Sequence, residues 1–185
     1  MIDYNPSRIV LLTALFIISI MVPACREETR PVESTSHIRL NDEGMIHYNR
    51  GVVKTEEQEI EDFLSRYGWN VRTTPTGLRY LVYRKGTGTL ASNGLLVRFR
   101  YTVKLLNGTL IYSSDSLGER QFRLGHGGVE PGLEEGMLLL REGDRAKLIL
   151  PSYLAYGLLG DQNRIPPGAT LVYDVEVKEI NKPSK

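Results

Sequence analysis

Histidine and cysteine, two residue types that often act in catalysis, are rare in this chain of 185 residues, and neither stands in a catalytic grouping. The three histidines, His37, His47 and His126, stand far apart, and the single cysteine, Cys25, lies close to the N-terminus. The adjacent carboxylates Glu134-Glu135 do not suit acid–base work on one substrate, because neighbouring positions on a helix point in different directions. We therefore expect no covalent catalysis, no metal ion and no cofactor.

Another kind of chemistry needs only a shaped pocket, and aromatic residues and prolines gather near the C-terminus. They form the segments PSYLAYG at residues 151–157 and RIPPGATLVYD at residues 164–174. These segments resemble the signature of FKBP-type peptidyl-prolyl cis-trans isomerases. The resemblance continues backwards through GDRAK at 143–147, GLEEG at 132–136 and VRFRY at 97–101. It covers roughly residues 77–180, with the motifs in the family's order and spacing.

The resemblance implies an activity that breaks no covalent bond. An X-Pro bond rotates over a barrier of about 18 to 20 kcal/mol, because amide resonance keeps it planar. An apolar pocket disfavours the charge-separated planar amide, and donors that bind the twisted amide more strongly lower the barrier. By resemblance the pocket consists of Tyr101, Ile111, Tyr112, Phe122, Val129, Glu130, Leu133, Tyr156, Ile165 and Tyr173. Tyr156 would offer its hydroxyl to the substrate carbonyl, and the backbone N–H of Glu130 would hold a second carbonyl. Leu133 would form the floor and Tyr173 a wall.

Four positions depart from the pattern of strongly active relatives. Counted without gaps, a Phe-Asp pair of the family becomes Ile111-Tyr112, and Arg120 stands where an aromatic residue is usual. Glu130 replaces an aliphatic residue, although its N–H survives any side chain. We therefore expect reduced turnover and weak affinity for the family's macrolide ligands. A one-residue bulge would instead bring Tyr112 into the aromatic position, and the sequence leaves this open.

The elements that must hold this pocket are predicted to form an α+β domain. Residues 97–105 alternate apolar with polar side chains, which indicates a half-buried antiparallel strand, and Asn107-Gly108 predicts a hairpin after it. Further strands are expected at 78–83, 109–113, 122–124, 146–150 and 171–180, with a short helix at 131–137 that has proline in its first turn. The expected fold is an FKBP-like antiparallel sheet wrapped around one short α-helix.

An amphipathic helix of about 12 residues is predicted ahead of this domain. Thr55-Glu56-Glu57-Gln58 has the pattern of a capping box, and Gly68 is placed to end the helix. Its apolar residues at helical spacing are Ile60, Phe63, Leu64 and Tyr67. Alone it would be marginal in water, so the apolar face must pack on the following domain, a second copy or a client protein. The segment through Trp69 is similar to that of gliding-motility-associated and related lipoprotein members of the family from Bacteroidetes.

The N-terminus has the features of a bacterial lipoprotein signal peptide. An apolar run of 14 residues, Ile9–Val22, is too short for a transmembrane helix of about 20 residues and suits a signal peptide. Cys25 follows after Pro23 and Ala24 and resembles the lipidated cysteine of a lipobox, although Pro23 departs from that pattern. Arg26-Glu27-Glu28 resembles a surface-export signal, with a plain solvated tether as the alternative.

The predicted organisation is a signal peptide at 1–24, a flexible tether at 25–50, an N-terminal helical segment at 51–76, an isomerase domain at 77–181 and a tail at 182–185. The predicted function is prolyl isomerisation that assists protein folding in the cell envelope. The alternative is an FKBP-fold binding module or holdase with little catalysis.

Expected partners are proline-containing unfolded or nascent envelope proteins, the outer membrane through Cys25, and a second copy through the N-terminal helix. The protein would face the periplasm or the cell surface. With 41% apolar residues, 24% charged residues and a net charge of +1, nucleic acid is not expected.

Overall fold

The computed structural model describes residues 42–183. The predicted signal peptide, the lipidation site Cys25 and the tether up to residue 41 lie outside these residues, as do the last two residues of the tail. None of the described helices is both long and apolar enough to cross a membrane. The elements are α2 (Asp42–Tyr67), β1 (Arg72–Thr73), β2 (Arg79–Arg84), β3 (Leu96–Leu105), β4 (Leu110–Ser113), α3 (Ser114–Leu117), β5 (Arg120–Arg123), α4 (Pro131–Leu138), β6 (Arg145–Leu150), the 3₁₀-helices η1 (Ser152–Leu154) and η2 (Gly157–Leu159), and β7 (Leu171–Asn181).

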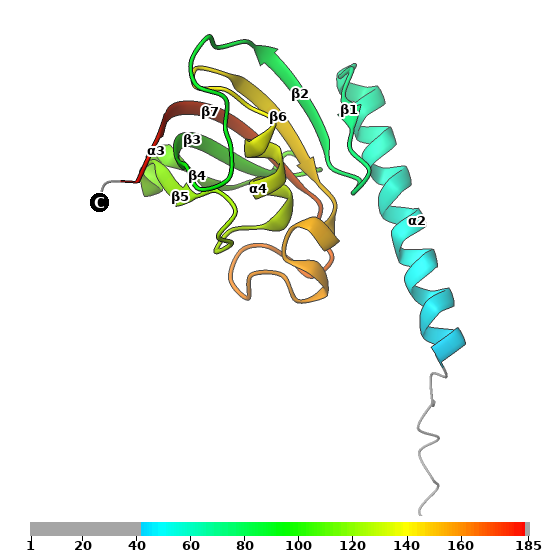
Figure 1. Ribbon diagram of the computed structural model, residues 1–185. Helices are drawn as coiled ribbons and strands as arrows, with labels where there is room; N and C mark the ends of the chain where they lie inside the picture. Colours follow the sequence, from blue (N-terminus) through cyan, green and yellow to red (C-terminus); the bar gives the residue numbers. More distant parts are fainter. Residues whose placement is uncertain (1–41, 184–185) are drawn as a thin grey trace, which may run out of the picture. The chain divides into compact units, whose positions relative to one another are not determined.

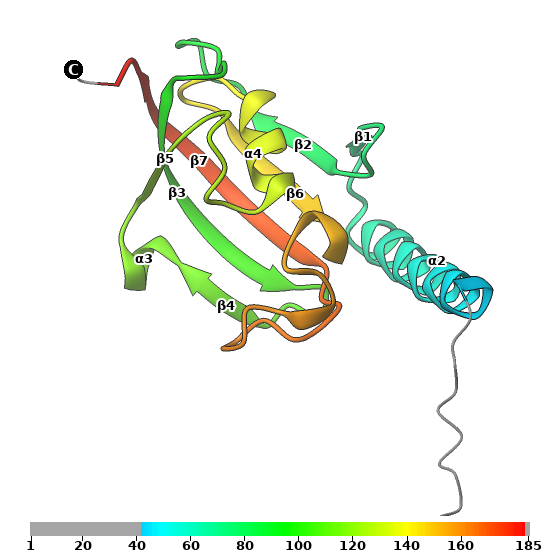
Figure 2. The same ribbon diagram turned by 60° about the horizontal axis from the view of Figure 1, so that its bottom comes forward.

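An antiparallel sheet of seven strands forms the centre of the fold (Figure 1). The strands lie in the order β1-β2-β6-β7-β3-β4, and β5 also pairs with β3. The N-terminal half of β3 pairs with β5 and its C-terminal half with β4, while β7 runs along its other edge (Figure 2). The predicted alternation along β3 is confirmed, since Val97, Phe99, Tyr101 and Val103 are all buried. The predicted antiparallel sheet with one short helix is therefore confirmed.

The short helix α4 packs closely on one face of this sheet. A Cβ atom added to Gly136 would lie 2.6 Å from Cδ1 of Leu148, and one added to Gly132 would lie 2.7 Å from Cγ of Leu150. Real Cβ atoms do not approach other atoms so closely, so the two glycines allow the helix backbone to come near β6. Pro131 begins the helix, as predicted.

The long helix α2 packs on the opposite face of the same sheet. Side chains alternate between the two faces along a strand, so Ile149 and Val172, a paired couple of β6 and β7, point away from the face that α4 covers. They form a second buried cluster with Ile60, Phe63 and Leu64 of α2. Of the three partners that the sequence left open for this apolar face, the chain's own domain is the one that it contacts.

The predicted start of this helix was wrong. The helix begins at Asp42 rather than at Thr55, so residues 42–50 are helical and not part of a flexible tether. A capping box requires non-helical backbone at its first residue. Here the helix continues through Thr55, whose hydroxyl donates to the carbonyl of Gly51 at 3.0 Å, one turn earlier. The predicted end is confirmed, because Gly68 follows Tyr67 with a left-handed φ of 62°.

Candidate active site

The ten predicted pocket residues are brought together on the face of the sheet that α4 covers. They come from four strands, from the start of α4 and from the loop between β6 and β7. Nine of them belong to one hydrophobic cluster, namely Tyr101, Ile111, Tyr112, Phe122, Val129, Leu133, Tyr156, Ile165 and Tyr173. Glu130 is the tenth, and its carboxylate contacts two members of that cluster. Residues up to 72 positions apart in the sequence therefore share one site, which is consistent with the predicted pocket.

Glu130 lies at the centre of the polar contacts in this site. The residue is only 5% exposed, although it carries a carboxylate. Its Oε1 atom accepts the hydroxyl of Tyr156 at 2.6 Å and the hydroxyl of Tyr173 at 2.7 Å. The Nη1 atom of Arg120 lies 3.5 Å from the same oxygen. The second oxygen, Oε2, is buried and accepts no hydrogen bond from the residues that the structure describes.

These contacts keep the carboxylate ionised. Burial alone would raise the pKa of Glu130, but the hydrogen bonds from Tyr156 and Tyr173 and the charge of Arg120 lower it below its ordinary value. The pKa of Tyr156 is raised by burial and by its hydrogen bond to Glu130. The pKa of Tyr173 is also raised, first by burial and then by Glu130. At neutral pH both tyrosines are therefore protonated donors to a charged acceptor.

Two of the four departures from the family pattern turn out to be partners of each other. Arg120 lies opposite Phe99 in the pairing of β5 with β3, at the edge of the predicted pocket. Its guanidinium reaches Glu130 and lies 5.7 Å from the centre of the Tyr101 ring. An acid and a base thus lie together at two positions where the family resemblance implies apolar residues. The sequence showed both replacements, but their pairing is visible only in the folded chain.

The bulge that the sequence left open is present in β4. Tyr112 pairs with Val103 and Leu110 pairs with Lys104, so Ile111 is the extra residue on this strand. Tyr112 thereby shares a face with the buried Val103 and packs against the pocket cluster. Ile111 is itself buried in that cluster, so both residues contribute to the site.

Tyr112 also holds a loop that the sequence did not connect with it. Its hydroxyl donates to the carboxylate of Asp161, and the guanidinium of Arg164 lies 5.5 Å from the centre of its ring. Asp161 in turn accepts the backbone N–H groups of Asn163 at 3.0 Å and Ile165 at 2.7 Å. Tyr112 therefore acts on the pocket by fixing the loop that carries Ile165.

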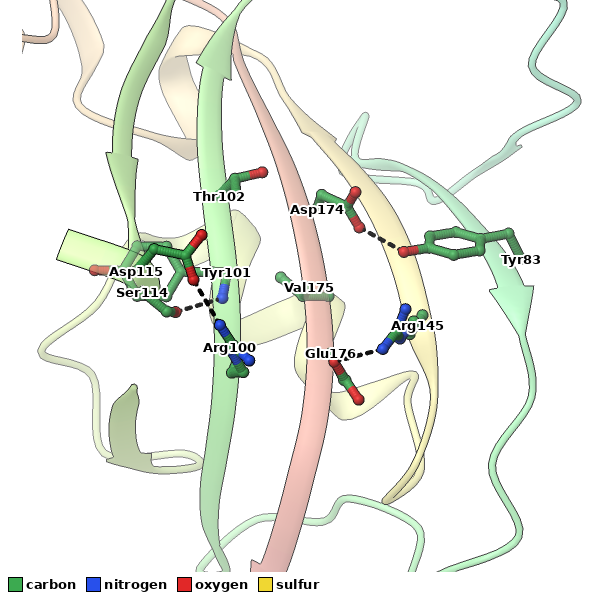
Figure 3. Close-up of a pocket in the computed structure, with 10 residues that line it drawn as sticks. All are labelled: Tyr83, Arg100, Tyr101, Thr102, Ser114, Asp115, Arg145, Asp174, Val175 and Glu176. Atoms are coloured by element: carbon green, nitrogen blue, oxygen red, sulfur yellow. Dashed lines mark hydrogen bonds and ion pairs between the residues drawn. The ribbon is translucent and has the colours of Figure 1, made fainter. Parts of the chain in front are cut away.

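A hollow of about 180 Å³ lies on the other face of the sheet (Figure 3). Most of its charged side chains contact one another. Arg100 contacts Asp115 at 2.5 Å, and Asp174 accepts the hydroxyl of Tyr83 at 2.8 Å. Of the ten predicted pocket residues only Tyr101 borders this hollow, and the alternation along β3 directs its ring toward the opposite face.

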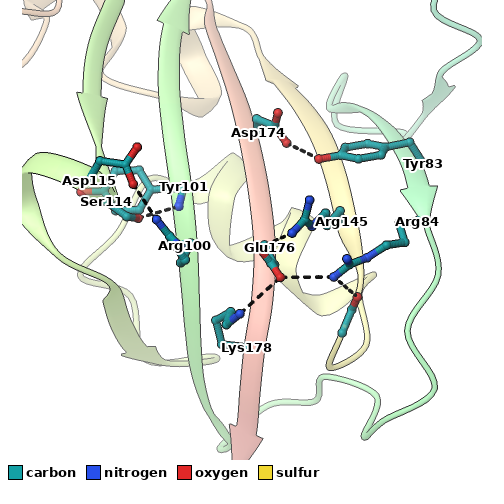
Figure 4. A network of polar contacts seen from close by, with 11 residues as sticks. Tyr83, Arg84, Arg100, Tyr101, Ser114, Asp115, Arg145, Asp174, Glu176 and Lys178 are labelled. Carbon is teal, nitrogen blue, oxygen red and sulfur yellow. Dashed lines mark hydrogen bonds and ion pairs between the residues drawn. The ribbon is translucent and has the colours of Figure 1, made fainter.

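The same face carries a network of ion pairs centred on Glu176 (Figure 4). This carboxylate contacts Arg145 at 2.9 Å, Arg84 at 3.2 Å and Lys178 at 3.3 Å. Such partly exposed pairs contribute about 0 to 1 kcal/mol each. We interpret this face as a solvated surface and not as the site of chemistry.

Comparison with known proteins agrees with this geometry. The family model for FKBP-type peptidyl-prolyl cis-trans isomerases matches residues 88–178. A probable FKBP-type isomerase of Haemophilus influenzae is 33% identical over 137 residues, which are 72% of this chain and 56% of that protein. The FKBP-type 22 kDa isomerase of Escherichia coli is 40% identical over 111 residues, 60% of this chain and 53% of that protein. The chain spans about half the length of the curated relatives it matches.

Two solved structures resemble the fold. The crystal structure of AtFKBP13 superposes with a TM-score of 0.58 at 31% identity, covering 60% of this chain and 98% of that one. The crystal structure of FkpA from Escherichia coli superposes with a TM-score of 0.62 at 26% identity, covering 98% of this chain and 84% of that one.

Proposed function

The chain belongs to the FKBP-type peptidyl-prolyl cis-trans isomerase family, and on that premise we propose that it catalyses rotation about X-Pro bonds with a partly self-occupied site. The observation that supports isomerisation most is that nine of the predicted pocket residues gather in one hydrophobic cluster. The hydrogen bond between Tyr156 and Glu130 supports the self-occupation of the site. The hydroxyl expected to meet a substrate carbonyl already donates to a carboxylate of the protein. An oxygen atom of the chain thus occupies the place that an oxygen atom of the substrate would take.

The apolar side chains supply the environment that isomerisation requires. Leu133 and Tyr173 are buried beneath the site, and Ile165 closes it from the loop between β6 and β7. A proline ring among these side chains leaves water, which disfavours the planar, charge-separated amide relative to the twisted one. Leu133 serves as the floor, Tyr173 as a wall and Tyr156 as the donor to the substrate carbonyl.

Substrate binding has to compete with Glu130. A substrate carbonyl can accept the Tyr156 hydroxyl only after the carboxylate has released it, and hydrogen bonds to charged groups are stronger than those to neutral ones. This competition is the physical reason for the reduced turnover that we expect.

A Tyr156→Phe substitution tests the proposal. We expect the parent protein to accelerate cis/trans isomerisation of a proline peptide and the variant to lose about tenfold in kcat/KM, because one hydrogen bond to the transition state is removed. Protease-coupled or NMR exchange measurements on a short X-Pro peptide give the rates. Tyr153→Phe is the matched control, since Tyr153 lies in the same loop, is half exposed and is expected to leave the rate unchanged.

No acceleration by the folded parent protein would contradict the catalytic proposal. The second candidate, a binding module or holdase, then becomes the better one, and the occupied Tyr156 hydroxyl favours it. It predicts that the parent binds proline-containing unfolded chains or delays their aggregation without changing the isomerisation rate.

We propose that the protein acts in the bacterial envelope as a lipid-anchored protein of the outer membrane, facing the periplasm or the cell surface. The apolar run Ile9–Val22, followed by Pro23, Ala24 and Cys25, supports this. Metabolic labelling with a radioactive fatty acid is expected to mark the parent and not Cys25→Ser. Equal labelling of both would exclude Cys25 as the lipidated residue.

The clients that fit this proposal are unfolded or nascent envelope proteins that contain proline. Self-association through α2 is a further proposal. Because Ile60, Phe63 and Leu64 pack on the chain's own domain, a homodimer through this helix would use another of its faces. Size-exclusion chromatography with light scattering measures the oligomeric state.

A further inference from the structure

The loop between β6 and β7 carries two of the predicted pocket residues, Tyr156 and Ile165. It runs through residues 151–170, and its two ends lie side by side because Leu150 pairs with Leu171. The loop thus has a narrow neck where it leaves the sheet and returns to it. A loop of this length without long regular elements needs contacts of its own to take one conformation.

One buried carboxylate closes this neck, and it comes from the helix α2. Glu56 is 7% exposed. Its Oε1 atom accepts the backbone N–H of Ser152 at 2.6 Å and the hydroxyl of Thr170 at 2.5 Å. Its Oε2 atom accepts the hydroxyl of Ser152 at 3.0 Å. Ser152 and Thr170 are the second and the last residue of the loop, so Glu56 binds both of its ends.

These contacts are strong enough to fix the loop. All three are hydrogen bonds to a charged acceptor, and both partner residues are buried. Without the carboxylate, the N–H and two hydroxyls would be left buried and unpaired. The ends of the loop would then gain by moving apart to reach water.

The position of Ser152 is passed on to Tyr156 through a short rigid segment. Ser152 begins the 3₁₀-helix η1, in which the N–H of Leu154 donates to Pro151 at 2.9 Å and the N–H of Ala155 donates to Ser152 at 3.0 Å. Tyr156 is the next residue. A shift of Ser152 therefore moves the tyrosine hydroxyl relative to Glu130.

We propose that Glu56 is a positioning residue for the site: by closing the neck of the loop 151–170 from α2, it sets where Tyr156 and Ile165 lie. The inference rests on the proposed isomerase function. It gives α2, which lies before the family-matched residues 88–178, a direct part in shaping the pocket. It also predicts that a disturbance of α2 reaches the pocket through this carboxylate.

The test compares Glu56→Ala with Glu56→Gln and with the control Glu59→Ala in the full chain. Glu59 is exposed on the same helix. We expect Glu56→Ala to lower kcat/KM for an X-Pro peptide by about tenfold. Backbone amide hydrogen exchange of Ser152 and of residues 153–157 should become faster, while the exchange of the sheet stays unchanged. Glu56→Gln should keep a large part of the parent's kcat/KM and of its slow exchange in this segment, because its amide oxygen still accepts the Ser152 N–H. Glu59→Ala should match the parent in both measurements.

Two outcomes would overturn the proposal. One is unchanged hydrogen exchange of residues 151–170 in Glu56→Ala. The other is faster exchange of this loop in Glu56→Ala together with a kcat/KM that equals that of the parent. A parent without measurable isomerisation would refute the proposed function but not this inference, because the exchange of the loop and the chemical shifts of Tyr156 still report whether Glu56 positions it. Should Glu56→Ala fail to fold, Glu56→Gln carries the comparison, with a smaller loss of kcat/KM and a smaller rise in the hydrogen exchange of residues 151–170 expected.

Discussion

A Glu130→Val substitution is expected to raise kcat/KM for prolyl isomerisation by about ten- to a hundredfold. The change removes the acceptor that holds the Tyr156 hydroxyl and returns an aliphatic side chain to the pocket. A hydrogen bond to a charged group contributes about 1.5 to 3 kcal/mol, and about 1.4 kcal/mol corresponds to a factor of ten in rate. The measurement is the isomerisation rate of a proline peptide with the parent and the variant at equal concentration.

A stability cost should accompany this gain in activity. Tyr173 is almost fully buried, and without Glu130 its hydroxyl has no partner among residues 42–183, which costs about 1 to 3 kcal/mol. Arg120 keeps nearly a third of its side chain exposed and can be hydrated. Urea unfolding therefore has to show that the variant is folded under the conditions of the rate measurement.

Glu130→Gln serves as the control for charge. It keeps the volume and one acceptor oxygen but makes the hydrogen bond from Tyr156 a neutral one. We therefore expect its kcat/KM to lie between those of the parent and of the valine variant. A folded Glu130→Val protein with the parent's rate, or a lower one, would show that the carboxylate does not compete with the substrate. The self-occupied site would then have to be abandoned as the cause of low turnover.

The strands and the short helix were predictable because each follows a local pattern. The buried residues of β3 alternate strictly with polar ones, and one face of an antiparallel strand can be identified from that period alone. Pro131 indicates the first turn of α4 in the same local way. The four elements β1, α3, η1 and η2, of two to four residues each, were missed.

The contacts that shape the site were not predictable, because they join distant residues. Glu56 lies 96 residues before Ser152 and 114 before Thr170. Its neighbours in sequence indicated a capping box, so its carboxylate was expected at a helix start rather than at the neck of a loop. The link between Tyr112 and Asp161 spans 49 residues and depends on a bulge that no local signal reveals. The type of each pocket residue was visible in the sequence, but its partner was not.

The largest expected effect on stability is that of Ile60→Asp, which should lower the free energy of unfolding by about 3 to 5 kcal/mol. Ile60 is fully buried between α2 and the sheet, where it packs with Ile149 and Val172. A carboxylate there loses its hydration without gaining a partner, and the apolar contacts of the isoleucine are lost as well. Urea unfolding followed by circular dichroism measures the change, with the exposed Glu59→Gln on the same helix as a control.

The shape of the unfolding transition matters as much as its midpoint. If α2 is part of one cooperative unit with the sheet, the parent unfolds in a single transition and Ile60→Asp shifts the whole transition. Loss of helical signal in a separate, earlier step, with the sheet as stable as in the parent, would contradict this and make α2 an independent attachment. The positioning role of Glu56 requires the cooperative result, because a helix that detaches without disturbing the sheet cannot hold the neck of the loop that carries Tyr156.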